Sequence, residues 1–213
     1  MVRGLIISLL LALPLPLGSH AQILSGILNV RGTSVPACGA IGSPCTDSFP
    51  GTSLSSNWIQ NVGVWGVASG VAYLTSTDSS NHGEAYYDAV TFTNNQFAKV
   101  TVSSVSGPQE YGPSVRNTSS GAYRLGCDDT SLTLWVVTWP SSYTLLGTST
   151  CSSGDQLFLG ASGTTITGYD VTLGSTHIAV ADSTWGSGYP GLAGYRTTTP
   201  TIGVSNWIGG DQP

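Results

Sequence analysis

The most evident shortage in this sequence is of charge. Charged residues make up 8% of the chain, Lys99 is the only lysine, and 11 Asp and Glu outnumber 6 Lys and Arg for a formal charge of −5. Nucleic-acid binding requires clustered Lys and Arg, so we expect no nucleic-acid partner. A hydrophobic content of 40% with a low net charge also argues against intrinsic disorder.

Long apolar runs are equally scarce, and the clearest one lies at the N-terminus. It extends from Leu5 to Leu17, follows Arg3, is interrupted by two prolines, and precedes a small-x-small sequence that ends at Ala21. It is shorter than the about 20 apolar residues that a bilayer core requires. We therefore predict that residues 1–21 are a secretory signal peptide, that the mature chain is secreted, and that it contains no membrane span.

Cysteine is limited to four residues, which in an exported chain predict two disulfides. Cys38 and Cys45 enclose a short loop with Gly and Pro, whereas Cys127 and Cys151 end consecutive strand candidates. These two pairings are favoured among three possible connectivities. A zinc site would need Cys-x-x-Cys or nearby histidines, and the sequence has neither arrangement.

Helical periodicity is absent over any window of ten or more residues. Instead, runs rich in Val, Thr, Tyr, Leu and Ile alternate with Gly, Ser, Asn, Asp and Pro clusters, and within one run Ala98, Val100 and Val102 share a face. Eleven or twelve strands predict an all-β sandwich of two antiparallel sheets. We assign residues 22–46 to an N-terminal lead-in with a small disulfide loop, and residues 47–211 to the domain.

Several segments within residues 47–211 carry a family resemblance, among them the central strand candidates 96–107, 113–117 and 121–127. The segment 47–74 has an Asp-x-Phe start and two tryptophans, and the segment 153–195 contains a Pro-Gly-Leu strand. Together with the terminal strand 203–211, these segments are similar to the concanavalin A-like lectin and glucanase superfamily, which includes laminin G-like jelly rolls. The resemblance implies a jelly-roll sandwich. It covers spacing and turns more than chemical groups, so it indicates fold better than activity.

Glycan cleavage is one hypothesis for this fold. It needs two carboxylic acids that face one bond, and Glu84 and Glu110 are the only glutamates. They would meet if their strands were neighbours in the concave sheet. However, the resemblance implies an active-site strand with acidic residues at alternate positions, which is missing here. His82, close to Glu84, is interpreted as a polar loop residue.

Sugar binding without cleavage is the preferred hypothesis. Trp135 and Trp139 lie four residues apart on one predicted strand face, which suits two positions along a glycan chain. Tyr111, Arg116 and Tyr123 come from preceding strands and are candidates for a polar rim. The alternative for each tryptophan is a place in the core, as we expect for Trp58, Trp65 and Trp207.

The resemblance also implies a structural Ca²⁺ near the paired terminal strands. Asp211 matches the position of a ligand from the last strand, and Asp47 is a candidate opposite it. A solvated terminal carboxylate is the alternative. Asn117 begins an Asn-Thr-Ser sequence, a glycosylation acceptor in a eukaryotic source.

Taken together, the sequence predicts a secreted module that binds carbohydrate or another extracellular partner. A polysaccharide-degrading hydrolase or lyase that uses Glu84 and Glu110 is the first alternative. A structural or adhesive surface protein is the second, and it would have no groove.

Overall fold

The computed structural model describes residues 38–103, 109–174, 176–197 and 203–213. The predicted signal peptide, and the lead-in before Cys38, lie outside these residues. The described ranges contain fifteen strands and no helix, so they include no helix that could cross a membrane. The all-β prediction is confirmed.

Sheet A is the larger of two antiparallel sheets. Its path runs β13-β12-β11-β6-β15-β4-β3, and β1 pairs with β15 beside this path. The strands are β1 (Cys45–Asp47), β3 (Val64–Ala68), β4 (Val71–Ser76), β6 (Gln96–Ser103), β11 (Gln156–Ser162), β12 (Thr165–Asp170), β13 (Ile178–Ala181) and β15 (Gly203–Asp211).

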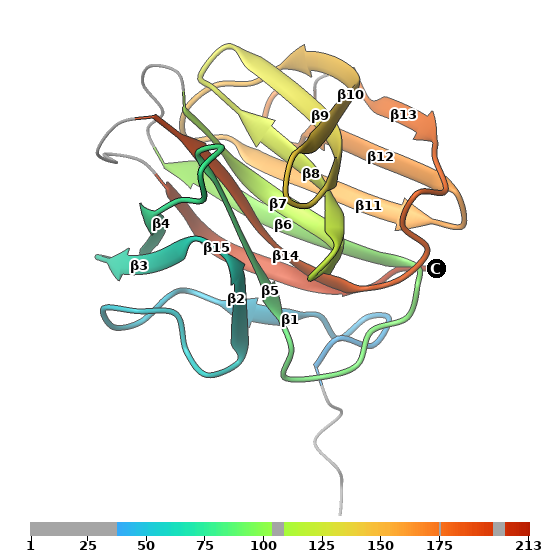
Figure 1. Cartoon of the computed structure of the whole chain (residues 1–213). Helices are drawn as coiled ribbons and strands as arrows, with labels where there is room; N and C mark the ends of the chain where they lie inside the picture. The colour runs from blue at the N-terminus through green and yellow to red at the C-terminus, as the bar shows by residue number, and fades with distance from the viewer. Residues whose placement is uncertain (1–37, 104–108, 175, 198–202) are drawn as a thin grey trace, which may run out of the picture. The chain divides into compact units, whose positions relative to one another are not determined.

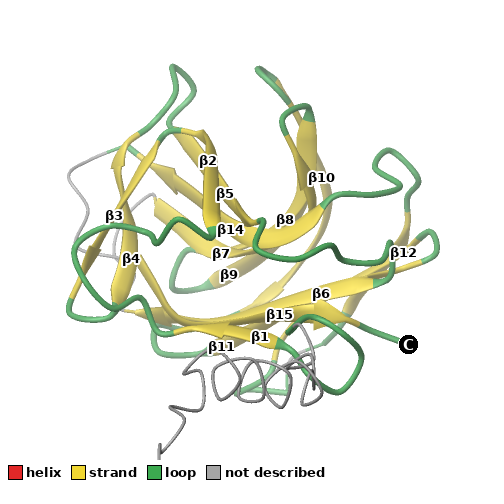
Figure 2. Ribbon diagram, turned by 90° about the horizontal axis from the view of Figure 1, so that it is seen from below, coloured by secondary structure: helices red, strands yellow, loops and turns green. Residues whose placement is uncertain are grey.

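Sheet B has seven strands in the order β10-β9-β8-β7-β14-β5-β2. These are β2 (Trp58–Val62), β5 (His82–Tyr87), β7 (Gln109–Thr118), β8 (Gly121–Cys127), β9 (Ser131–Thr138), β10 (Ser142–Thr150) and β14 (Tyr189–Arg196). Figure 2 shows the two layers, with sheet B bent so that its edge strands β2 and β10 rise away from sheet A. In Figure 1, β10 crosses in front of β8 and β9.

The core lies between the two sheets and follows the predicted alternation. Ala98, Val100 and Val102 are fully buried, whereas the residues between them are half-buried. Trp65 and Trp207 are also buried. Together with Trp58, which packs edge-on against Trp207 at 4.9 Å, they confirm the expectation of a tryptophan-rich core.

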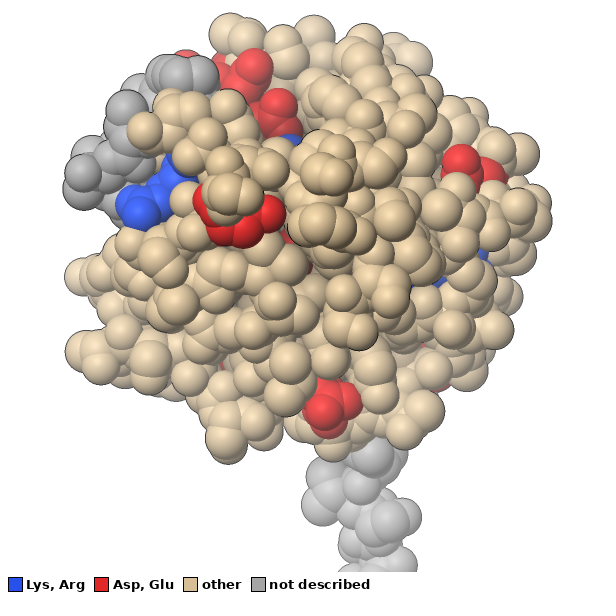
Figure 3. Space-filling view, viewed as in Figure 1, with Lys and Arg blue, Asp and Glu red and all other residues tan. Residues whose placement is uncertain are grey.

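Both predicted disulfides are present. Cys38 is bonded to Cys45 and Cys127 to Cys151. The first holds the chain at the start of β1, and the second joins the end of β8 to the segment after β10. Figure 3 shows that charged atoms form only small, isolated groups on the visible face, as the low charge content requires.

Candidate functional site

The outward, concave face of sheet B collects polar side chains around strand β14, which lies between β7 and β5. Tyr195 pairs with His82 of β5 on one side and with Glu110 of β7 on the other, and Ala193 pairs with Glu84. Residues directly opposite each other in an antiparallel ladder share a face. Glu84 and Glu110 therefore lie on one face, but β14 separates their strands.

Arg124 of β8 links these groups. Its Nη2 atom lies 3.1 Å from Glu110 Oε2 in an ion pair, and its Nη1 atom donates a hydrogen bond to His82 Nδ1 at 2.5 Å. The arginine is only 3% exposed. Arg124 Nε is buried and has no hydrogen-bond partner among the described residues.

His82 is held in its neutral form. Because arginine can only donate, Nδ1 accepts the hydrogen bond and the ring proton lies on Nε2. Burial, and then the adjacent Arg124 charge, lower the pKa of His82 to about 3. The ring stacks on Tyr143 at 4.2 Å and lies 4.9 Å from Tyr195. His82 begins β5 instead of lying in a loop, which corrects our interpretation.

Glu84 lies on the same face as His82 and is fully buried. Its Oε2 accepts a hydrogen bond from Asn117 Nδ2 at 3.0 Å, and Oε1 has no partner among the residues that the structure describes. Burial raises the pKa of Glu84 to about 8, against the opposing effects of Arg124, Ser114 and Asn117. Asn117 is itself buried and occupied by these bonds, so its amide is not exposed as a glycan acceptor.

A cavity of about 240 Å³ opens beside Arg124 on this face. It exists because the β9–β10 hairpin bends over the sheet and carries Tyr143 to His82, although β10 and β5 are far apart in the strand order. The lining residues are His82, Glu110, Arg124, Trp135, Tyr143 and Tyr195.

Gly126 makes room for the Glu110 side chain in this arrangement. A Cβ atom at this position would lie 2.6 Å from Glu110 Oε2, closer than such contacts occur. Gly191 similarly allows Ser114 Oγ to approach, since an added Cβ would lie 2.9 Å from it. These small residues give the concave face its depth.

Of the two predicted tryptophans, Trp135 lines the cavity. It lies on β9 opposite Arg124 of β8 and Leu145 of β10. Trp139 follows the end of β9 and packs edge-on against Tyr143 at 6.0 Å, so it supports the cavity wall from outside its lining. The two do not form the flat, two-position platform that we expected.

The predicted polar rim is not on the concave face. Tyr111 is fully buried, packs against Trp65, and accepts a hydrogen bond from Leu74 N. Its strand alternation directs it into the core, because neighbouring Glu110 faces outward.

Arg116 and Tyr123 instead anchor the loop before β14. Arg116 is 2% exposed and donates to the backbone carbonyls of Asn94, Gly163 and Trp185. Tyr123 donates to Asp182 Oδ1 at 2.6 Å and accepts from Trp185 N. Both side chains hold backbone segments together and are not free to bind a ligand.

The two aspartates proposed for calcium do not come together. Asp47 pairs with Trp207, four residues before Asp211, which corresponds to about 13 Å along a strand. Asp47 accepts hydrogen bonds from Phe49 N and Trp58 Nε1, and Asp211 accepts one from Thr93 N. No group of three or more His, Cys, Asp or Glu suited to a metal ion occurs among the described residues. Asp47 and Asp211 therefore do not fit one shared calcium site.

Sequence reasoning missed Arg124, Tyr143 and Tyr195. Arg124 had a detectable signal, because it is one of only six cationic residues and lies inside an otherwise apolar strand, AYRLGC. A buried cation in a strand requires a partner. Tyr143 had no such signal, since its role depends on the bend of a distant hairpin.

Comparisons with known proteins identify the fold. No protein-family model and no curated protein sequence matches the chain. Among solved structures, it is similar to the carbohydrate-binding module CBM66 from Bacillus subtilis, with a TM-score of 0.50 and 11% identity over 76% of this chain and 97% of that one.

Two further structures extend the comparison. A Bacillus subtilis protein of unknown function with a galectin-like fold has a TM-score of 0.54 and 10% identity over 78% of this chain and 94% of that one. The Crh5 transglycosylase has a TM-score of 0.51 and 11% identity over 83% of this chain and 87% of that one.

The chain has the concanavalin A-like jelly-roll fold, as the resemblance implied. At identities of 10 to 11%, the comparisons establish the fold alone. A binding module and a transglycosylase both occur among these structures, so the fold does not choose between binding and catalysis.

Proposed function

We propose that this protein binds carbohydrate in the cavity on the concave face of sheet B. The observation that carries the proposal is the composition of its lining: aromatic walls from Trp135, Tyr143 and Tyr195 around the Arg124–Glu110 ion pair. Aromatic rings pack against the apolar face of a pyranose, and fixed polar groups bind its hydroxyls.

The ion pair provides a donor and an acceptor side by side. Arg124 is held between His82 and Glu110, so its guanidinium is already ordered before a ligand arrives. Neighbouring sugar hydroxyls each act as donor and acceptor, which matches this arrangement.

The size of the cavity favours one sugar unit. At about 240 Å³ it is slightly smaller than the roughly 300 to 1,000 Å³ of typical pockets for drug-sized ligands. The structural or adhesive alternative predicted no groove, so the cavity counts against it. The two disulfides fit an oxidising compartment and support an extracellular location.

Binding can be tested by affinity electrophoresis in gels that contain different polysaccharides. We expect Trp135→Ala to weaken binding by about 1 to 3 kcal/mol, the usual cost of one well-buried aromatic contact. Tyr169→Ala, on β12 of sheet A, is a matched aromatic control that should bind like wild type. Equal binding by folded Trp135→Ala and wild type would contradict the proposal.

A polysaccharide-degrading enzyme is the second candidate, and one observation favours it. Burial keeps Glu84 protonated by raising its pKa to about 8, while Glu110 pairs as a carboxylate with Arg124 on the same face. Glycosidases use one protonated and one ionised carboxyl. Against this, Glu84 is fully buried and does not line the cavity.

Product analysis separates the two candidates. If the protein only binds, wild type should release neither reducing ends nor unsaturated ends from the polysaccharide it binds. Glu84→Gln and Glu110→Gln should then show no turnover either. Turnover by wild type that both Gln variants abolish, with binding retained, would establish the enzyme instead.

A further inference from the structure

A second cavity lies where β15 changes its neighbour in sheet A. Val204 pairs with Ala72 of β4, whereas Trp207 and the residues after it pair with β1. Between these two pairings, Asn206 has a φ of 52° and the register with β6 shifts. The bulge and the change of partner leave a hollow at this edge.

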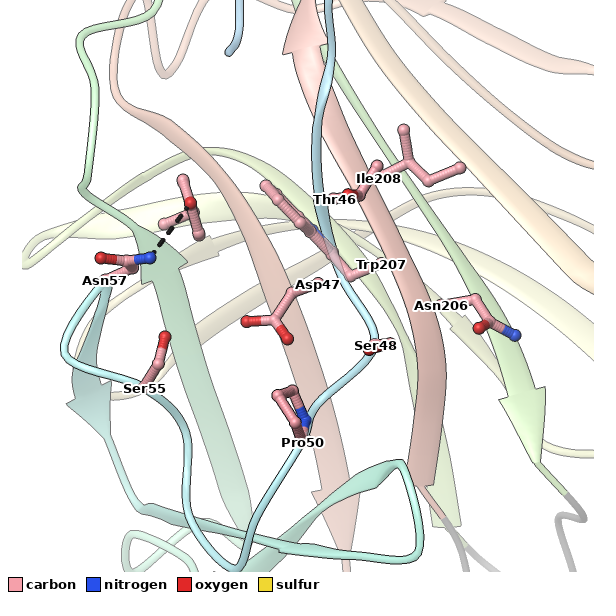
Figure 4. A pocket seen from close by; sticks show the side chains of 10 residues that line it. Thr46, Asp47, Ser48, Pro50, Ser55, Asn57, Asn206, Trp207 and Ile208 are labelled. Atoms are coloured by element: carbon pink, nitrogen blue, oxygen red, sulfur yellow. Dashed lines mark hydrogen bonds between the residues drawn. The ribbon is translucent and has the colours of Figure 1, made fainter. Parts of the chain in front are cut away.

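This hollow has a volume of about 530 Å³ and shares no residue with the concave cavity. Figure 4 shows the side chains around it, with Asp47 between Pro50 and Asn57. The lining residues are Thr46, Asp47, Ser48, Pro50, Ser55, Asn57, Tyr87, Asn206, Trp207 and Ile208.

Buried aromatic rings lie behind its inner wall. Trp207 stacks on Tyr87 with ring centroids 4.9 Å apart and planes 27° apart, and Trp58 packs edge-on against both. These rings belong to the core, so the wall is rigid.

Asp47 presents a fixed acceptor to the hollow. Its Oδ1 accepts from Phe49 N at 2.7 Å and its Oδ2 from Trp58 Nε1 at 2.8 Å. A carboxylate has about four acceptor positions, so two remain for a ligand. Asn57 Nδ2 donates to Tyr87 OH at 3.3 Å, which leaves the amide carbonyl of Asn57 to accept from a ligand.

We propose that this hollow is a second ligand site, for one neutral sugar unit or a polyol of similar size. A fixed carboxylate, two amides and three Ser and Thr hydroxyls match a ligand rich in hydroxyl groups, and the exposed Pro50 beside Tyr87 matches its apolar face. An anion would meet Asp47 with no Lys or Arg in the lining to balance it. A cation would find only one carboxylate in the lining, fewer charged oxygen ligands than a divalent cation usually requires.

The test is a ¹H–¹⁵N NMR titration of the full chain with glucose, mannose, galactose, xylose and N-acetylglucosamine. We expect at least one sugar to shift the Trp58 indole N–H and the Asn57 amide resonances in a saturable way, because both groups adjoin the fixed carboxylate. Ser55→Trp should fill the hollow and abolish the shifts. Asn57→Ala should weaken binding by about three- to tenfold, the effect of one lost hydrogen bond.

Controls separate this site from the concave cavity. Asn94→Ala removes an exposed asparagine that does not line the hollow and should bind like wild type. Trp135→Ala should also leave these shifts unchanged. The proposal for this hollow and the proposal for the concave cavity can therefore fail independently of each other. The absence of saturable shifts with every sugar, or their loss in Trp135→Ala, would overturn the proposal.

Discussion

At the scale of single residues, Glu84 and His82 carry the largest electrostatic consequence of the fold. Both are buried beside Arg124, and burial favours the neutral form of each. The acid therefore keeps its proton at neutral pH and the base does not gain one. The Glu84 effect lowers stability as pH rises, whereas the His82 effect lowers stability as pH falls.

For Glu84, the folded-state pKa of about 8 exceeds the ordinary value of 4.5. The folded chain then holds a proton that the unfolded chain has lost, so stability falls as pH rises from about 4.5 to about 8. For His82, the pKa of about 3 lies below 6.5, so stability falls as pH drops from 6.5 to about 3. Above pH 6.5, only the Glu84 effect of these two remains.

We therefore predict that Glu84→Gln flattens the pH dependence of stability between about pH 6.5 and 8. Wild type should lose up to about 1.4 kcal/mol per pH unit in this range. Thermal unfolding across the range measures the difference. Glu110→Gln is the matched control and should retain the slope of wild type. Parallel curves for wild type and Glu84→Gln would show that Glu84 is already ionised in the folded chain.

At the scale of elements, the disulfides fix the ends of strands that the loops alone would leave free. Cys127 ends β8 and is fully buried, and its bond to Cys151 encloses β9 and β10. The bend of this β9–β10 hairpin carries Tyr143 to His82. The Cys127–Cys151 bond thus supports the strands on which the concave cavity depends.

Removing this disulfide should lower the free energy of unfolding by about 3 kcal/mol, because the bond restricts the unfolded chain over a sequence separation of 24. Urea unfolding of Cys127→Ser/Cys151→Ser measures the loss. The double variant Cys38→Ser/Cys45→Ser removes a disulfide that spans a shorter separation of 7, so its loss should be about 1 kcal/mol smaller. A larger loss from the Cys38–Cys45 pair would contradict this loop-length account.

At the scale of the whole molecule, the described residues form a two-sheet sandwich with two separate cavities. One lies on the outward face of sheet B, and the other at the β1–β15 edge of sheet A. Of the few charged residues, Arg116 and Arg124 are buried and make their contacts inside the protein.

The calcium hypothesis is best tested on the whole molecule. A ligand that binds only the folded state raises the melting temperature, so a calcium-bound protein should melt earlier in EDTA. Because Asp47 and Asp211 lie apart and are engaged by backbone and indole donors, we expect equal melting temperatures in EDTA and in excess calcium. A higher temperature with calcium would restore the hypothesis drawn from the sequence.

Local patterns in the sequence were enough to predict the strands and disulfides. The alternation in β6 and the Cys127–Cys151 pairing depend on side-chain period and on strand ends, which neighbouring residues determine. The described residues contain fifteen strands, more than the eleven or twelve expected, and short strands such as β1 and β2 carry no long alternating run that would indicate them. The family resemblance added the jelly-roll type of the sandwich.

The sites depended on tertiary structure. Alternation placed Glu110 and Tyr111 on opposite faces of their strand, but only the packed sheets show which face is the core. Only the sheet order shows that β14 separates Glu84 from Glu110. Sequence alone therefore determined the sandwich and its disulfides, since these follow from local periodicity and spacing. The curvature of sheet B and the bulge at Asn206 determined the two cavities, because each is lined by residues that approach only after distant strands pair.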